Sequence, residues 1–204
     1  MATGREIKQV YNAMKRICGE ASQMLTVIHD NFGKRGFVIN SGSKSVMWGR
    51  ASSYDDPNRW LPYFQQIVFK CKADTDANKC VGVNTMFDDI GGGLEDAVPF
   101  ISCGMITCRD RDSFRNSDDF YVAGWDGRAG TTIKLPLYTT TFSSENCKEI
   151  VNYFLPWDAI TSEEKVVSLI VDPLISLYKG EHNEAIERVR DFAISVDQFK
   201  DAMS

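Results

Sequence analysis

Histidine, proline and long apolar runs are all scarce in this sequence. The 204 residues include 2 histidines and 6 prolines. So little histidine leaves few ways to build a catalytic triad or a histidine-rich metal site. No apolar run approaches the roughly 18 residues of a membrane-spanning helix, and the polar N-terminal stretch MATGREIKQVYNAMKR carries no secretory signal. We therefore expect no membrane association.

An excess of basic residues is also missing. Lys and Arg number 23 against 28 Asp and Glu, which gives a net charge of −5. A protein that binds nucleic acid usually carries a basic excess or stripe, so this composition disfavours nucleic acid as a partner. The 43% hydrophobic and 25% charged residues are typical of a globular protein. With no repeat or linker evident, we predict one domain over residues 1–204.

The 6 cysteines form no recognisable metal motif. Eight residues separate Cys71 from Cys80 and four separate Cys103 from Cys108, spacings that fit no standard zinc pattern. A hairpin would bring Cys71 and Cys80 opposite one another. A chain of this length needs no disulfide to fold, and these four positions lie in apolar or alternating segments. We expect reduced cysteines, a cytoplasmic location and no bound cofactor.

An amphipathic helix is predicted over residues 3–31. Apolar residues recur from Ile7 to Ile28 at steps of three and four, which describes one helix face. Thr3 and Glu6 have the spacing of a capping box. Such a helix is about 40 Å long, longer than a domain of this size comfortably covers. The sequence therefore predicts a homodimer through residues 7–28.

The region 36–141 reads as strands. Segments 36–40 and 44–48 flank a short hairpin signal, and further strands are expected over residues 61–71, 81–87, 100–108, 120–125 and 131–141. Residues 100–108 are apolar throughout, as in a central strand. Pro136 argues for an edge position. No helical pattern separates the strands, which favours an antiparallel meander.

Helices are predicted again over residues 144–203. The first is capped by Ser143 or Ser144 and runs to Phe154. The second runs from Thr161 toward Tyr178 and is kinked or divided at Pro173, and the last follows Gly180. The predicted fold is thus α+β: an antiparallel meander sheet of about six or seven strands, with a long N-terminal helix and C-terminal helices packed on it.

The strongest candidate site is a cluster of aromatic and arginine residues. Arginine and aromatic side chains anchor planar or anionic ligands by bidentate hydrogen bonds and stacking, and they dominate protein interfaces. The predicted ligand-binding residues are Trp48, Arg50, Arg59, Trp60 and Tyr63. Packing at a corner of the sheet explains the same cluster without a ligand.

Carboxylates around the glycines at 91–93 offer an alternative. Asp88 and Asp89, with Asp126, are candidate ligands for a divalent metal in an enzyme, although a solvated loop explains them as well. Neither His29 nor His182 lies in a nucleophile motif. We therefore expect a non-enzymatic cytoplasmic module that senses a small ligand or binds a protein, with a metal-dependent enzyme as the alternative.

Overall fold

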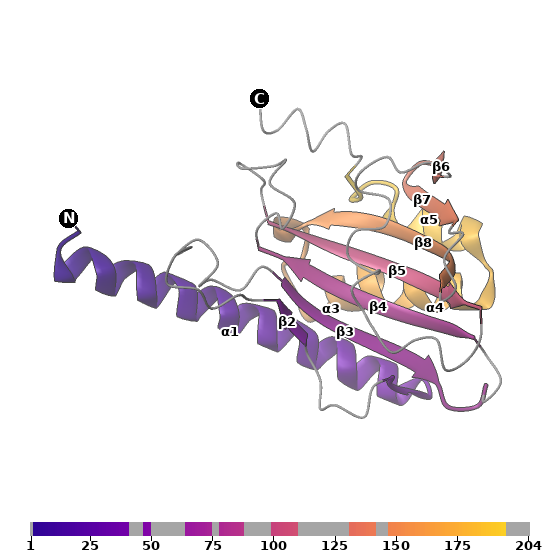
Figure 1. Ribbon diagram of the computed structural model, residues 1–204, viewed down its shortest axis with the longest axis horizontal. Coiled ribbons are helices and arrows are strands. Elements are labelled where there is room, and N and C mark those ends of the chain that lie inside the picture. Colours follow the sequence, from indigo (N-terminus) through magenta and orange to yellow (C-terminus); the bar gives the residue numbers. More distant parts are fainter. Residues whose placement is uncertain are drawn as a thin grey trace.

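The protein is an antiparallel sheet with helices packed on one side of it, as seen in a computed structural model of the chain (Figure 1). The structure describes residues 2–40, 47–49, 64–74, 78–87, 99–109, 131–141 and 147–194. The strands of the sheet are β1 (Phe37–Ile39), β2 (Met47–Gly49), β3 (Phe64–Cys71), β4 (Lys79–Met86), β5 (Phe100–Cys108), β6 (Thr131–Lys134), β7 (Leu137–Thr141) and β8 (Cys147–Pro156). The helical elements are α1 (Gly4–Lys34), the 3₁₀ turn η2 (Trp157–Ala159), α3 (Glu163–Val166), the π-helical turn η3 (Val167–Val171), α4 (Asp172–Lys179) and α5 (His182–Val189).

The 8-stranded sheet has the order β1-β3-β4-β5-β8-β7-β6, with β2 also paired to β3. Every pairing is antiparallel. Two meanders, β3-β4-β5 and β6-β7-β8, are joined because the last strand, β8, lies beside β5. The predicted fold class, a long N-terminal helix, an antiparallel meander sheet and C-terminal helices, is confirmed.

The predicted hairpin of residues 36–40 with 44–48 is wrong. The described parts, β1 and β2, are short strands that each pair with β3: Phe37 lies opposite Cys71, and Met47 lies opposite Gln66. Because β3 is long enough to pair with both, the two short strands bind successive parts of the same edge instead of one another.

The predicted helix from residue 144 to 154 is also wrong, because its described part, from Cys147 onward, belongs to β8. Ile150, Val151, Tyr153 and Phe154 are all at most 1% exposed. A central strand buried on both faces shows a continuous apolar run in place of alternation, and over a short segment that run is hard to tell from a helix. The β-branched and aromatic residues favour a strand.

The predicted strand 131–141 is two strands. β6 and β7 form a hairpin, with Thr131 opposite Thr140 and a turn at Leu135 and Pro136. Pro136 therefore lies between strands, where its missing N–H breaks no ladder hydrogen bond. The predicted strand 120–125 lies outside the described residues.

The capping box of α1 is confirmed. The Thr3 backbone N–H donates to Glu6 Oε2 at 2.6 Å, and the Glu6 N–H donates to Thr3 Oγ1 at 3.3 Å. The C-terminal half of α1 packs in the core, where the Phe32 ring stacks on Phe69 with centroids 4.5 Å apart. Its N-terminal half projects beyond the sheet (Figure 1).

Pro173 does not divide the helical run, which continues from the π-helical turn η3 directly into α4; the irregularity lies in η3, just before the proline. Proline at position 173 has no N–H to donate to the Leu169 carbonyl four residues earlier. The Tyr153 hydroxyl supplies a donor instead, at 2.8 Å from the Leu169 oxygen. This hydrogen bond ties the helical layer to β8 through the buried core, and burial raises the pKa of the Tyr153 phenol, so it stays a donor.

Candidate functional site

The sheet has two buried faces that differ in what packs on them. The first face carries residues such as Val83, Ile101 and Val151, which belong to the core shared with α1, η3 and α4. On the second face, Ile106, Ile150 and neighbouring side chains are equally buried. None of the described helices lies on that second face (Figure 1). The predicted central position of β5 is confirmed, because it lies between β4 and β8 and is buried on both faces.

A row of polar side chains crosses the second face. Gln66 on β3 lies opposite Asn84 on β4, and Asn84 lies opposite Ser102 on β5. Residues directly opposite one another in a sheet share a face, with Cβ atoms about 5 Å apart. Their exposed fractions are 2%, 0% and 0%. We call these three residues the polar row.

Two members of the polar row have unsatisfied side-chain atoms. Neither Oδ1 nor Nδ2 of Asn84 has a hydrogen-bond partner, and neither does Oγ of Ser102. A buried polar group without a partner costs about 1–3 kcal/mol, and such groups are rare in native proteins. Asn84 and Ser102 therefore have hydrogen-bonding capacity that no described residue uses.

Glycines occupy the next positions along the same face. Gly82 on β4 lies opposite Gly104 on β5, and Gly104 lies opposite Asn152 on β8. A Cβ at Gly104 would lie 2.7 Å from the Val151 carbonyl oxygen and 2.8 Å from Asn152 Cβ. Glycine thus allows β5 and β8 to approach closely, and two adjoining positions beside the polar row carry no side chain.

Aromatic rings lie at the end of the row nearest β8. Phe154 is directly opposite Ser102. Its ring is 5.8 Å from the Phe100 ring and 5.4 Å from the Tyr138 ring, measured between centroids. All three side chains are at most 5% exposed. They give the polar row an apolar, aromatic border.

The described part of the second face is neutral around the row. Burial raises the pKa of the Cys80 thiol to about 12, with the Lys70 ammonium partly opposing this effect, so the thiol is uncharged at neutral pH. Lys70 and Lys148, at strand ends, are exposed. A charged molecule bound at the row would find no opposite charge beside it among the described residues.

The predicted aromatic and arginine site is described only at one position. Trp48 lies in β2, where its backbone is opposite Gln65. Arg50, Arg59, Trp60 and Tyr63 lie outside the described residues, as do the candidate metal ligands Asp88, Asp89 and Asp126. The described residues therefore test neither prediction.

The histidines are not drawn into a common site. His29 is exposed near the C-terminal end of α1, 3.3 Å from the Asp30 carboxylate, and His182 begins α5. Among the described residues, no cluster of His, Cys, Asp and Glu has the arrangement of a metal site.

Cys71 and Cys80 do not face one another. Val81 pairs with Phe69, so Cys80 points to the second face, whereas Cys71 packs at the margin of the core on the first. Free thiols are found at Cys18, Cys71, Cys80, Cys103 and Cys108.

The polar row was not found from the sequence, although a signal for it exists. Asn84 interrupts the buried segment VGVNTM, and Ser102 interrupts FISCGM. A polar residue inside a strand that is apolar on both faces must be accounted for by a partner or a ligand. Only the register, however, places the two residues side by side.

Comparison with models of protein families, with curated proteins and with solved structures finds no match to this chain. None of the helices in the described part of the chain combines the length and the apolar character needed to cross a membrane.

Proposed function

We propose that this chain is a non-enzymatic cytoplasmic module that binds a small, neutral molecule at the polar row. One observation carries the proposal: Asn84 and Ser102 are completely buried, adjacent, and have three side-chain atoms without hydrogen-bond partners. A bound molecule that pairs these atoms would recover hydrogen-bond energy that the free protein lacks.

The side-chain chemistry favours a ligand with an amide-like edge. The Asn84 amide presents a donor and an acceptor side by side, and the Ser102 hydroxyl can act as either. An amide, lactam or nucleobase edge offers the complementary pair, as when asparagine binds the edge of adenine. The rings of Phe100, Phe154 and Tyr138 favour a planar molecule, because aromatic faces stack.

Binding without catalysis fits the same residues. A serine nucleophile needs a general base within hydrogen-bond reach, and Ser102 Oγ has no hydrogen-bond partner. Asn84 carries no titratable group. The cytoplasmic assignment is supported by the free thiols of Cys80, Cys103 and Cys108, since reduced cysteine is typical of that compartment.

A thermal-shift experiment with matched probes tests the proposal. Nicotinamide, benzamide, adenine and uracil carry the neutral edge, whereas nicotinate and benzoate replace the amide with a charge. At about 100 times its Kd a ligand stabilises by about 2.7 kcal/mol, which corresponds to a rise in Tm of about 5–10 °C for a chain of this length. We expect such a rise with at least one neutral probe and none with the acids.

Substitutions in the polar row test whether the probe binds there. Asn84→Leu and Ser102→Ala should abolish the rise in Tm, while Asn12→Leu, the same change as the first on the exposed outer side of α1, should preserve it. A rise that survives both row variants, equal rises with amides and acids, or no rise with any neutral probe would each contradict the proposal.

A further inference from the structure

The apolar face of α1 continues beyond the part that the core covers. Ala21, Leu25 and Ile28 are at most 5% exposed and pack in the core. Toward the N-terminus the same spacing continues, but Ile7, Val10 and Tyr11 are 60%, 64% and 62% exposed. We call this part of the face the projecting stripe. It consists of three exposed residues, Ile7, Val10 and Tyr11, and three half-buried residues, Met14, Ile17 and Cys18.

The structure narrows the interface predicted from the sequence. The predicted dimer used residues 7–28, but the chain's own core occupies the stripe from Ala21 onward. Residues 4–20 remain and span about 25 Å of helix. Three large apolar side chains on an exposed helix are unusual in a monomer and are typical of a surface that a partner covers.

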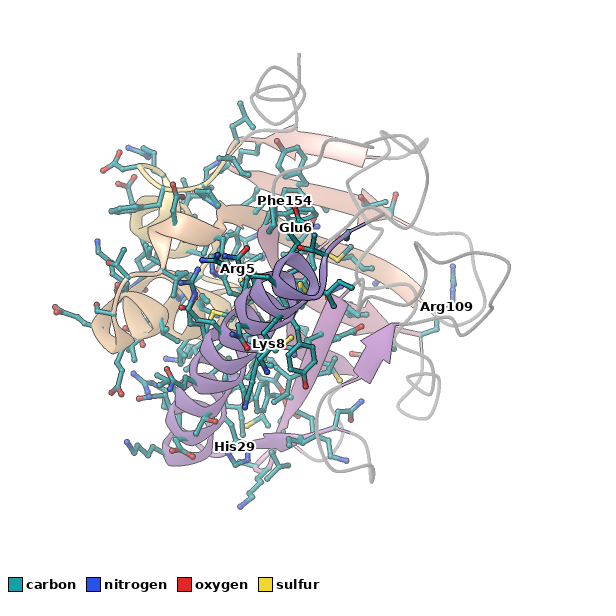
Figure 2. All side chains as sticks on the ribbon, turned by 90° about the vertical axis from the view of Figure 1, so that its left-hand side faces the viewer. Arg5, Glu6, Lys8, His29, Arg109 and Phe154 are labelled. Carbon is teal, nitrogen blue, oxygen red and sulfur yellow. The ribbon has the colours of Figure 1, made fainter. Side chains whose placement is uncertain are left out.

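Charged residues border the projecting stripe asymmetrically. At 100° per residue, Glu6 and Glu20 fall along one edge of the stripe and Lys8 and Lys15 along the other. The Lys8 ammonium lies 5.5 Å from the Tyr11 ring centroid, beside the stripe. Figure 2 looks onto this end of α1, where Arg5, Glu6 and Lys8 are labelled. The helix thus has an acidic edge and a basic edge.

We infer that residues 4–20 of α1 pair in parallel with the same residues of a second copy of this chain. In a parallel pair related by a two-fold axis, the acidic edge of each helix lies beside the basic edge of the other. In an antiparallel pair, each edge would meet its own kind and the like charges would repel. Edge charges of this type set partner orientation in paired helices.

The resulting dimer has low affinity, and its two helices point in the same direction. With few anchor residues, the interface falls at the small end of specific interfaces, and we expect a Kd on the order of tens of micromolar. The two sheets then lie at the same end of the paired helices, because the C-terminal half of each α1 stays on its own sheet. This inference is independent of the ligand proposed at the polar row.

Sedimentation equilibrium over about 1–200 μM measures the association of the full chain. We expect a monomer–dimer equilibrium. Val10→Asp should raise Kd at least about tenfold, because it places a charge in the stripe. Asn12→Asp adds the same charge on the opposite side of the helix and should leave Kd within about threefold. Circular dichroism checks that each variant remains folded, since neither position is in the core.

Cysteine cross-linking tests the orientation. In a parallel pair, the two copies of position 7 face one another, so Ile7→Cys should form a disulfide-linked dimer on mild oxidation. Because Cys18 is a free thiol in the stripe and would face its own copy, the test uses a Cys18→Ser background. In that background Ile7→Cys should cross-link, whereas Asn12→Cys and the Cys18→Ser chain alone should not. A monomer throughout the concentration range, a dimer indifferent to Val10→Asp, or a dimer that Ile7→Cys does not cross-link would overturn the inference. So would a monomer that binds vesicles containing phosphatidylserine through this helix.

Discussion

Removal of the Ser102 hydroxyl should stabilise the ligand-free protein. Oγ of Ser102 is buried without a hydrogen-bond partner, and an unsatisfied group of this kind costs about 1–3 kcal/mol. Ser102→Ala deletes the atom with little change in volume, so we expect the free energy of unfolding to rise by about 1–2 kcal/mol. For a chain of this length, that corresponds to a rise in Tm of about 2–8 °C.

Tyr153→Phe is the matched control, because it also deletes one buried hydroxyl from the sheet. The Tyr153 hydroxyl donates to the Leu169 carbonyl oxygen at 2.8 Å, where Pro173 provides no helical donor. Its loss removes this buried hydrogen bond, so the free energy of unfolding should fall by about 0.5–1.5 kcal/mol.

Urea unfolding followed by circular dichroism, on protein dialysed free of small molecules, measures both changes. The two substitutions should have opposite signs. If Ser102→Ala lowers stability as much as Tyr153→Phe does, the Ser102 hydroxyl is paired in solution and leaves no hydrogen-bonding group free for a ligand at the polar row.

Two further predictions concern the sheet. Gly104→Ala should destabilise the protein by about 1–3 kcal/mol, because the new Cβ would lie 2.8 Å from Asn152 Cβ. Gly19→Ala, which lies in open space on α1, should instead stabilise it by about 0.5–1 kcal/mol. Similar effects of the two substitutions in denaturant titrations would contradict the close approach of β5 and β8. Burial raises the pKa of Cys80 to about 12, so the stability this thiol contributes is complete below its unfolded pKa of about 8.5 and is lost as pH rises toward 12. Urea titrations from about pH 8 to 11 should therefore show a smaller loss in Cys80→Ala, by up to about 1.4 kcal/mol per pH unit; equal slopes would show that Cys80 is accessible.

Local patterns predicted the elements whose signal lies within a few residues. The capping box of Thr3 and Glu6 is present, and residues 100–108 form a strand with the predicted bounds. Residues 144–154 were misread because burial on both faces of β8 removes the alternation that identifies a strand. The two short strands at 37–39 and 47–49 were misread because adjacent segments need not pair with one another.

The candidate site depends on information that no local pattern holds. Asn84 and Ser102 are neighbours only because β4 and β5 pair in one particular register. A shift of one residue would turn one of the two side chains to the other face. The sequence shows a polar residue in each of two apolar strands, and the pairing of those strands makes them a row.

The place of β8 in the sheet has a consequence for how the protein forms as it is made. Until residues 147–156 leave the ribosome, β5 has no partner on one side, and the hairpin of β6 and β7 has nothing to join. The C-terminal half of α1 is buried even later, because residues 163–171 supply part of the surface that covers it. Nascent chains therefore expose an apolar helix face for most of synthesis, and an unpaired edge of β5 from the time β5 is made until β8 emerges. Such surfaces invite aggregation.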